Sequence, residues 1–170
     1  MDHETHLYET RNFLIKHIAE EFVRAIYLIE NVSDEIYVNI GGHFRHNVDF
    51  ANNFLNGLTA EKIDYSKRER DERIEQNRQY AIEKIVLLIR HLQSLPDEVL
   101  EKEISVCSEI DETVWHISSV MRELEFLHSH TVHHHALIAE KLAVFGVKVS
   151  KDFGVAPSTL KFWAKVQSAN

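Results

Sequence analysis

Apolar residues recur every three or four positions along four long stretches of the chain, which is the spacing that buries one face of a helix. These stretches cover residues 5–31, 41–55, 67–95 and 118–145. Four long helices, with a long crossover between the third and the fourth, are typical of a four-helix bundle. The pattern therefore predicts an all-α fold. Because the chain has the length of one ordinary domain and no internal repeat, we expect a single domain over residues 1–170.

Residues that cap or break helices mark the ends of these stretches. Gly57 follows the second stretch, Pro96 the third and Gly146 the fourth, and both residue types commonly stop a helix. Ser119 is a suitable cap for the fourth helix. Pro157 predicts the start of a further helical segment, because proline is favoured in the first turn of a helix.

The crossover, residues 99–116, has a different pattern. Residues that favour strands are concentrated in it, namely Ile104, Val106, Thr113, Val114 and Trp115. Ser108 to Asp111 contain residues that form turns. Two interpretations stay open for this segment, a short β-hairpin and an irregular connection.

Composition and charge narrow the classes of function. The chain has only 5 Gly and 2 Pro, which favours long helices over a sandwich rich in turns. Its net charge is −8 and no basic stripe is present, so we do not expect it to bind nucleic acid. No apolar run approaches the ~20 residues that cross a bilayer, so we expect no membrane span. Cys107 is the single cysteine and the first residues do not resemble a signal peptide, which together predict a cytoplasmic protein.

Histidine makes up 12 of the 170 residues, and its placement on the fourth helix is informative. On a helical wheel of ~100° per residue, His130 and His134 lie within ~40° of each other at the centre of the apolar stripe. His133 lies at the edge of that stripe. His128 and His135 fall on the opposite side, where we expect solvent.

Two imidazoles four residues apart on one helix face can bind a single metal ion. The sequence lacks the glutamate that follows the first histidine in H-E-x-x-H proteases, so that mechanism is not predicted. A second interpretation is that His130 and His134 are hydrogen-bonded core residues. Buried imidazole nitrogens need partners, and two on the midline of an apolar stripe favour the metal site.

Further ligands would come from other helices. His43 and His46 on the second helix are candidates for the third ligand, and the polar stripe that contains His46 either faces water or lines a wet pocket. His17 and Glu21 on the first helix are candidates for a fourth ligand or a supporting residue.

Two carboxylates are candidate catalytic residues. Glu123 lies two turns before His130 on the same helix face, and Asp49 flanks His46. Each is a candidate general base or a group that orients a ligand. The other interpretation makes each a buried ion-pair partner, of Arg122 and Arg45 respectively.

Two short segments resemble the DinB-like superfamily of metalloenzymes. Members typically carry Ile-Gly-x-x-x-x-His on the second helix, which here is Ile40 to His46. They carry His-x-x-His-His on the last bundle helix, which here is His130 to His134. The Arg-Gly-Gln that follows in many members is replaced by His135-Ala136-Leu137, which places this chain in a divergent branch.

The resemblance implies a four-helix bundle that holds one Zn or Ni ion through His46, His130 and His134, with positions left open for water or substrate. Characterised members include thiol transferases and isomerases that use low-molecular-weight thiols such as bacillithiol or mycothiol, and others are described as metal-dependent hydrolases. Many form homodimers through bundle helices. The sequence-based hypothesis is therefore a metal-dependent transferase that adds a small thiol to an electrophilic substrate, or a hydrolase. The alternatives are a non-enzymatic metal- or ligand-binding bundle with a stress-related role, and an interaction protein whose histidines are polar core.

Overall fold

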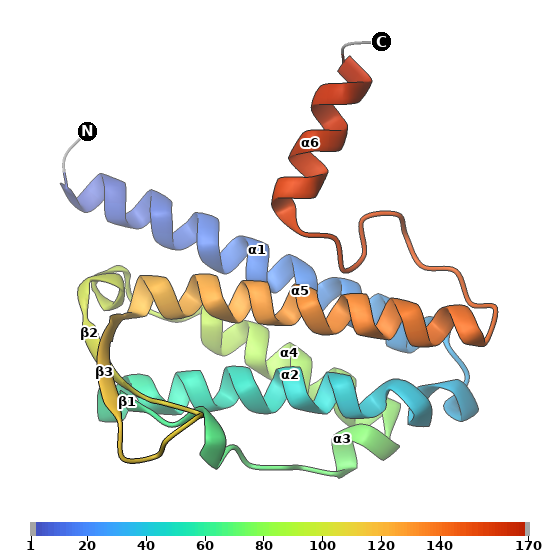
Figure 1. Ribbon diagram of the computed structural model, residues 1–170, viewed down its shortest axis with the longest axis horizontal. Helices are drawn as coiled ribbons and strands as arrows, with labels where there is room; N and C mark the ends of the chain where they lie inside the picture. The colour runs from blue at the N-terminus through green and yellow to red at the C-terminus, as the bar shows by residue number, and fades with distance from the viewer. Residues whose placement is uncertain (1–2, 169–170) are drawn as a thin grey trace.

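The computed structural model describes residues 3–168, and most of them are helical. Four long helices form the body of the molecule (Figure 1): α1 (His3–Asn31), α2 (Asp34–Ala60), α4 (Arg78–Gln93) and α5 (Val120–Val144). α2 packs against α5 and α4, and α1 packs against the same two helices. One continuous apolar core lies between the four helices. The predominance of helix agrees with the sequence pattern, and a small sheet is added to it.

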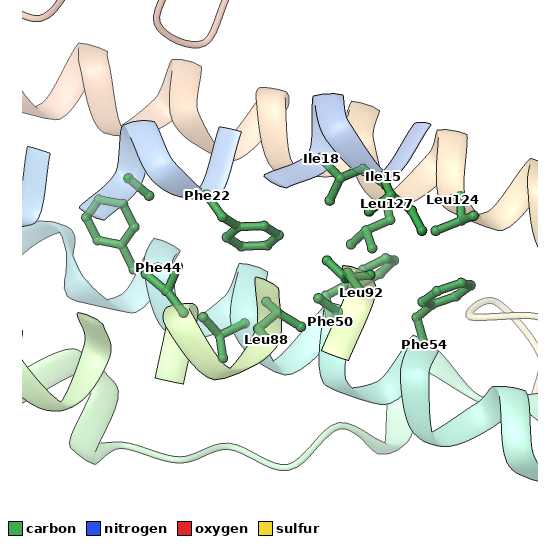
Figure 2. Packing of buried hydrophobic residues seen from close by; sticks show 14 of the residues in the cluster. Ile15, Ile18, Phe22, Phe44, Phe50, Phe54, Leu88, Leu92, Leu124 and Leu127 are labelled. Carbon is green, nitrogen blue, oxygen red and sulfur yellow. The ribbon is translucent and has the colours of Figure 1, made fainter. Parts of the chain in front are cut away.

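The core is built from the apolar faces that the helical periodicity marks. Figure 2 shows Phe22 of α1, Phe44 and Phe54 of α2, Leu88 of α4 and Leu127 of α5 along the space between the helices. All five side chains are at most 1% exposed. Burying a large apolar side chain contributes about 1.5–3 kcal/mol, so this layer stabilises the placement of α2 against α5.

The start of α2 differs from the prediction. α2 begins at Asp34 and not at residue 41, because the Ser33 hydroxyl accepts a hydrogen bond from the Ile36 N–H, at 3.3 Å, and caps the helix there. Gly41 therefore lies inside the helix. A Cβ at Gly41 would lie 2.3 Å from the Glu75 carbonyl oxygen, so glycine is needed for the close approach of the short helix α3 (Arg73–Gln76). Gly57 is likewise internal, and the helix continues to Ala60.

The predicted helix over residues 67–95 is shorter and interrupted. Its first part is a 3₁₀ turn (η1, Tyr65–Lys67), a loop and α3, and the long helix α4 starts only at Arg78. The Asn77 side chain accepts a hydrogen bond from the Tyr80 N–H at 3.0 Å and so caps α4. A second 3₁₀ turn, η2 (Asp97–Glu101), follows Pro96.

The crossover contains the β-hairpin that was one of its two interpretations. β2 (Glu103–Cys107) pairs antiparallel with β3 (Trp115–Ser119), and the Ser108 hydroxyl accepts hydrogen bonds from the Ile110 and Asp111 N–H groups in the turn. A short strand that the sequence did not indicate, β1 (Lys62–Ile63), pairs parallel with β2. The sheet ties the end of α2 to the start of α5, which Ser119 caps as predicted.

The last helix, α6 (Pro157–Ser168), starts at Pro157 as predicted and projects away from the other helices (Figure 1). None of its residues is buried, and Phe162 and Trp163 are 63% and 42% exposed. Among the described residues, every helix is too short or too polar to span a bilayer.

Candidate metal centre

Three histidines from two helices converge in the structure. His46 of α2 lies against His130 and His134 of α5, and one ring nitrogen from each lies within 4.8 Å of the other two. The ring centroids of His46 and His134 are 4.4 Å apart, and those of His46 and His130 are 4.9 Å apart. The group that the sequence and the resemblance indicated is therefore assembled, and it could hold a metal ion.

The packing of α2 on α5 positions these side chains. His130 and His134 are one helical turn apart, so both rings leave α5 on the face that meets α2. The Phe50 ring, one turn after His46, stacks on His130 with centroids 3.9 Å apart and 15° between the planes. The same Phe50 ring stacks on Tyr65 at 4.1 Å. The His130 ring is thus held in one orientation by a column of aromatic rings.

One ring nitrogen of His130 has the surroundings expected of a metal ligand. Its Nε2 atom is buried and has no hydrogen-bond partner among the described residues. An unsatisfied buried polar atom costs about 1–3 kcal/mol, so natural structures rarely retain one without a reason. A metal ion would satisfy this nitrogen, since imidazole is a usual ligand of Zn, Ni and related ions.

The surroundings keep the three rings neutral. Burial and, to a smaller extent, the nearby Arg68 and Arg45 together lower the pKa of His46 to about 4. Burial, together with the neighbouring His46, lowers the pKa of His130 to about 4 and that of His134 to about 3. Neutral imidazole is the form that binds a metal, so these rings are ready to act as ligands at neutral pH.

His43 contacts the cluster without belonging to it. His43 lies one helical turn before His46 on α2. Its Nδ1 lies 3.0 Å from Nδ1 of His134. When Nδ1 of His134 donates this hydrogen bond, Nε2 of His134 carries the lone pair that is available to an ion. Hydrogen bonds of this kind orient ligating histidines in metal sites.

The two candidate carboxylates lie beside the cluster rather than in it. Asp49 is buried and forms an ion pair with Arg45 at 3.1 Å, as one interpretation expected, and burial raises its pKa to about 6 against the opposing effect of Arg45. Glu123 is also buried, but its hydrogen bonds within residues 3–168 come from the Tyr65 hydroxyl at 2.8 Å and the Ser118 hydroxyl at 2.7 Å. The expected pairing with Arg122 is replaced by these two hydroxyl groups.

The expected exposure of His135 is wrong. Its side chain is 0% exposed, its Nδ1 lies 2.9 Å from Oε2 of Glu21, and its ring stacks on Phe153. The loop between α5 and α6 folds back over this face of α5, and a Cβ at Gly154 would lie 2.3 Å from the Ala136 nitrogen. The helical wheel cannot show this cover, because it treats the helix as isolated. His128 is half-buried, with its ring beside that of His17 of α1, which the isolated wheel cannot show either. His133 is exposed.

The first helix adds no ligand to the cluster. Glu21 is engaged by His135 and Arg24. The Nδ1 atom of His17 lies 2.8 Å from the Phe13 carbonyl oxygen, and its ring lies beside His128 rather than beside the three clustered histidines. Both residues were candidates for a fourth ligand, and neither is among the clustered metal-binding side chains of the described residues.

A cleft of about 420 Å³ opens on the cluster. Its polar lining includes His43, His46, His134, Arg45, Glu75 and Lys141. His46 and His134 are therefore reachable by a small molecule from this side, whereas His130 lies behind them and does not line the cleft.

Comparisons with known proteins leave the family open. No family model matches the sequence, and no solved structure matches it. The chain is 31% identical over 103 residues to the protein named FK506-binding protein 5 of Rhizopus delemar, which covers 58% of this chain and 27% of that protein. The chain thus spans about a quarter of that relative's length, and the similarity does not establish membership of a family.

Proposed function

We propose that this protein is a DinB-like, four-helix-bundle metalloenzyme that holds one divalent ion through His46, His130 and His134. The reaction that we propose is transfer of a low-molecular-weight thiol to an electrophilic small molecule. The observation that carries the proposal is the convergence of three neutral imidazoles beside an open cleft. Three histidine ligands with open positions are the arrangement of catalytic rather than structural zinc sites.

The donor set favours Zn or Ni. Three nitrogen ligands with no thiolate suit either ion. Such an ion, when bound, supplies Lewis acidity that brings the pKa of a coordinated thiol or water toward neutrality. The sulfur of Cys107 is not available as a ligand here, since this residue is buried in β2 and burial raises the pKa of its thiol.

The surrounding residues have separate roles in this proposal. His43 orients His134 through the Nδ1 contact. Asp49 is the better candidate for proton exchange, because its pKa of about 6 lies near the working pH. Glu123 is held by two hydroxyl groups, so we assign it a positioning role: it fixes Tyr65, which stacks on Phe50, which stacks on His130.

We extend the proposal to assembly and location. A homodimer is supported by the apolar side chains that α1 leaves in solvent, Phe13, Val23 and Tyr27, each more than half exposed. Large exposed apolar side chains in one region often mark an interface. A reducing, cytoplasmic location is supported by the unpaired Cys107.

Metal analysis of protein purified without a histidine tag tests the site. The proposal predicts about one Zn or Ni per chain, falling below about a tenth in His130→Ala. His91→Ala is the matched control, because His91 is exposed on α4 and should keep its metal. Little metal in the unaltered protein, unchanged by His130→Ala, would leave the histidines as polar core.

A conjugation assay then tests the reaction. Zinc- and nickel-loaded protein is incubated with small thiols and a panel of electrophiles, and thiol consumption is followed. Turnover that is lost in His130→Ala supports the transferase. Release of hydrolysis products without thiol would favour the hydrolase, and no turnover with any thiol or metal would favour a non-enzymatic binder.

A further inference from the structure

The cleft beside the three histidines carries basic side chains in a chain whose net charge is −8. Arg45 precedes His46 on α2, and Lys141 follows His134 by two turns on α5. Both side chains line the cleft. Glu75 also lines the cleft, so the lining carries two cations and one carboxylate in a chain that is acidic as a whole.

Lys141 is a cation for which no ion pair occurs within residues 3–168. Its ammonium group donates to the Asn39 carbonyl oxygen at 3.3 Å, which carries it across the cleft from α5 to α2. Lys16, Lys67 and Lys102 each pair with a carboxylate, and what distinguishes Lys141 from the other unpaired lysines of the described residues is that it lines this cleft. Arg45 differs, because it is held by Asp49 and Glu75 and so has a fixed position in the wall.

The charges with the largest effects on the histidines have one sign. The pKa of His46 is lowered by Arg68, Arg45 and Arg70 in addition to burial, and the pKa of His43 is lowered by Lys141. None of the charged side chains with the largest effects on the pKa values of His43, His46, His130 and His134 is a carboxylate. Lys141 and Arg45 therefore place positive charge beside the histidines, partly offset by Glu75, and a bound divalent ion would add to it.

The cleft also has the form of a small-molecule site. Its volume of about 420 Å³ lies within the range of ligand pockets. Gly42 lines it, and a Cβ added there would meet nothing nearer than the Glu75 carboxylate at 3.7 Å. Because Gly42 has no side chain, the cleft stays open beside His43, His46 and Lys141.

We propose that this cleft binds the carboxylate or phosphate group of a small anionic substrate, with Lys141 as the cation that recognises it and Arg45 as a fixed basic wall. This inference rests on the proposed function, because it takes the three-histidine cluster as the reacting end of the same site. The substrate class is thus a small anion that also carries the group to be transformed. Neutral and cationic analogues bind more weakly, since they leave the Lys141 ammonium without a counter-charge.

Anion titration by calorimetry at low ionic strength tests the proposal. Inorganic phosphate, succinate and the neutral succinamide are titrated into the full chain, once metal-free and once with one zinc per chain. Lys141→Gln is expected to weaken binding of the preferred anion about three- to tenfold, as loss of one charge-assisted contact would. Lys165→Gln on the projecting helix α6 removes the same charge far from the cleft and should change nothing. Lys141→Arg should restore most of the affinity.

The results distinguish the two proposals. A preference for phosphate or for succinate identifies the anionic group. Equal anion affinity in Lys141→Gln and Lys165→Gln, no anion binding by the unaltered chain, or equal binding of succinamide each overturns the anion site, and the zinc content decides separately whether the metal site stands. Anion binding that depends on Lys141 in a chain that takes up no zinc would keep the cleft as an anion site and refute the proposed metalloenzyme.

Discussion

Nδ1 of His43 lies 3.0 Å from Nδ1 of His134, so two helices contribute an imidazole pair at the edge of the three-histidine cluster. Ligating histidines are commonly oriented by a hydrogen bond at the nitrogen that does not face the metal. His43→Ala is therefore expected to keep the fold and lower zinc affinity about 10- to 100-fold. Competition with a chromophoric chelator measures this affinity. An affinity equal to that of the exposed-site variant His133→Ala would show that His43 does not orient His134.

Tyr65 secures Glu123 inside the protein through a hydrogen bond of 2.8 Å. Tyr65→Phe leaves the buried carboxylate with Ser118 as its hydroxyl donor. We expect the free energy of unfolding to fall by about 1–3 kcal/mol, the cost of an unsatisfied buried acceptor. Urea denaturation measures the change, with Tyr27→Phe as control because Tyr27 is 69% exposed. Equal stability of the two variants would contradict a structural role for this hydrogen bond.

The neutral histidines make the metal-free protein sensitive to acid. The folded pKa values, about 4 for His46, about 4 for His130 and about 3 for His134, lie below the ordinary value of 6.5. As pH falls below 6.5 the unfolded chain takes up protons at these positions while the folded chain does not, so the free energy of unfolding decreases toward pH 4.

Urea denaturation of the metal-free protein at pH 7 and pH 5 measures this decrease. Each histidine contributes at most about 1.4 kcal/mol per pH unit, an upper bound because the rings are only half-buried. His134→Phe should reduce the loss of stability, and His91→Phe should not. The same acid sensitivity in His134→Phe as in the unaltered chain would show that His134 is already charged when folded.

Two glycines with the same φ test whether the loop between α5 and α6 packs over His135. Gly146 and Gly154 both have φ of +71°, but a Cβ at Gly146 meets no atom within 4 Å, whereas one at Gly154 lies 2.3 Å from the Ala136 nitrogen. Gly146→Ala should cost about 1–2 kcal/mol of unfolding free energy from the left-handed backbone alone. Gly154→Ala should cost clearly more, because the loop must also move away from α5. Thermal and urea unfolding measure both; equal costs would mean that the loop is not packed on α5 as described.

The parts of the site that lie on one helix could be predicted from the sequence. The helical wheel places His130 and His134 together because their relation depends only on the pitch of α5. The wheel could not place His46 beside them; that came from the resemblance, since the packing of α2 on α5 is a tertiary property. Burial of His135 was missed for the same reason, because Glu21 and Phe153 lie far from it in the sequence.

The errors in the fold also come from tertiary or capping effects. Gly41 looked like a helix start, but it is internal and makes room for the Glu75 backbone of α3. The third predicted helix was too long because the Asn77 cap starts α4 at Arg78, a local signal that the surrounding helical periodicity obscures. The hairpin was among the interpretations, since strand-favouring residues flank a turn, but the parallel partner β1 has only two residues and no pattern of its own.

X-ray absorption spectroscopy of the zinc- or nickel-loaded protein tests the central claim most directly, because it counts the ligands around the ion. The proposed metal site predicts three imidazole nitrogens at about 2.0–2.1 Å with the remaining positions filled by oxygen from solvent, and two imidazoles in His46→Ala. The matched control His43→Ala should retain three. A spectrum with one imidazole or none, with sulfur at the ion, or without change in His46→Ala would contradict a metal centre built from His46, His130 and His134.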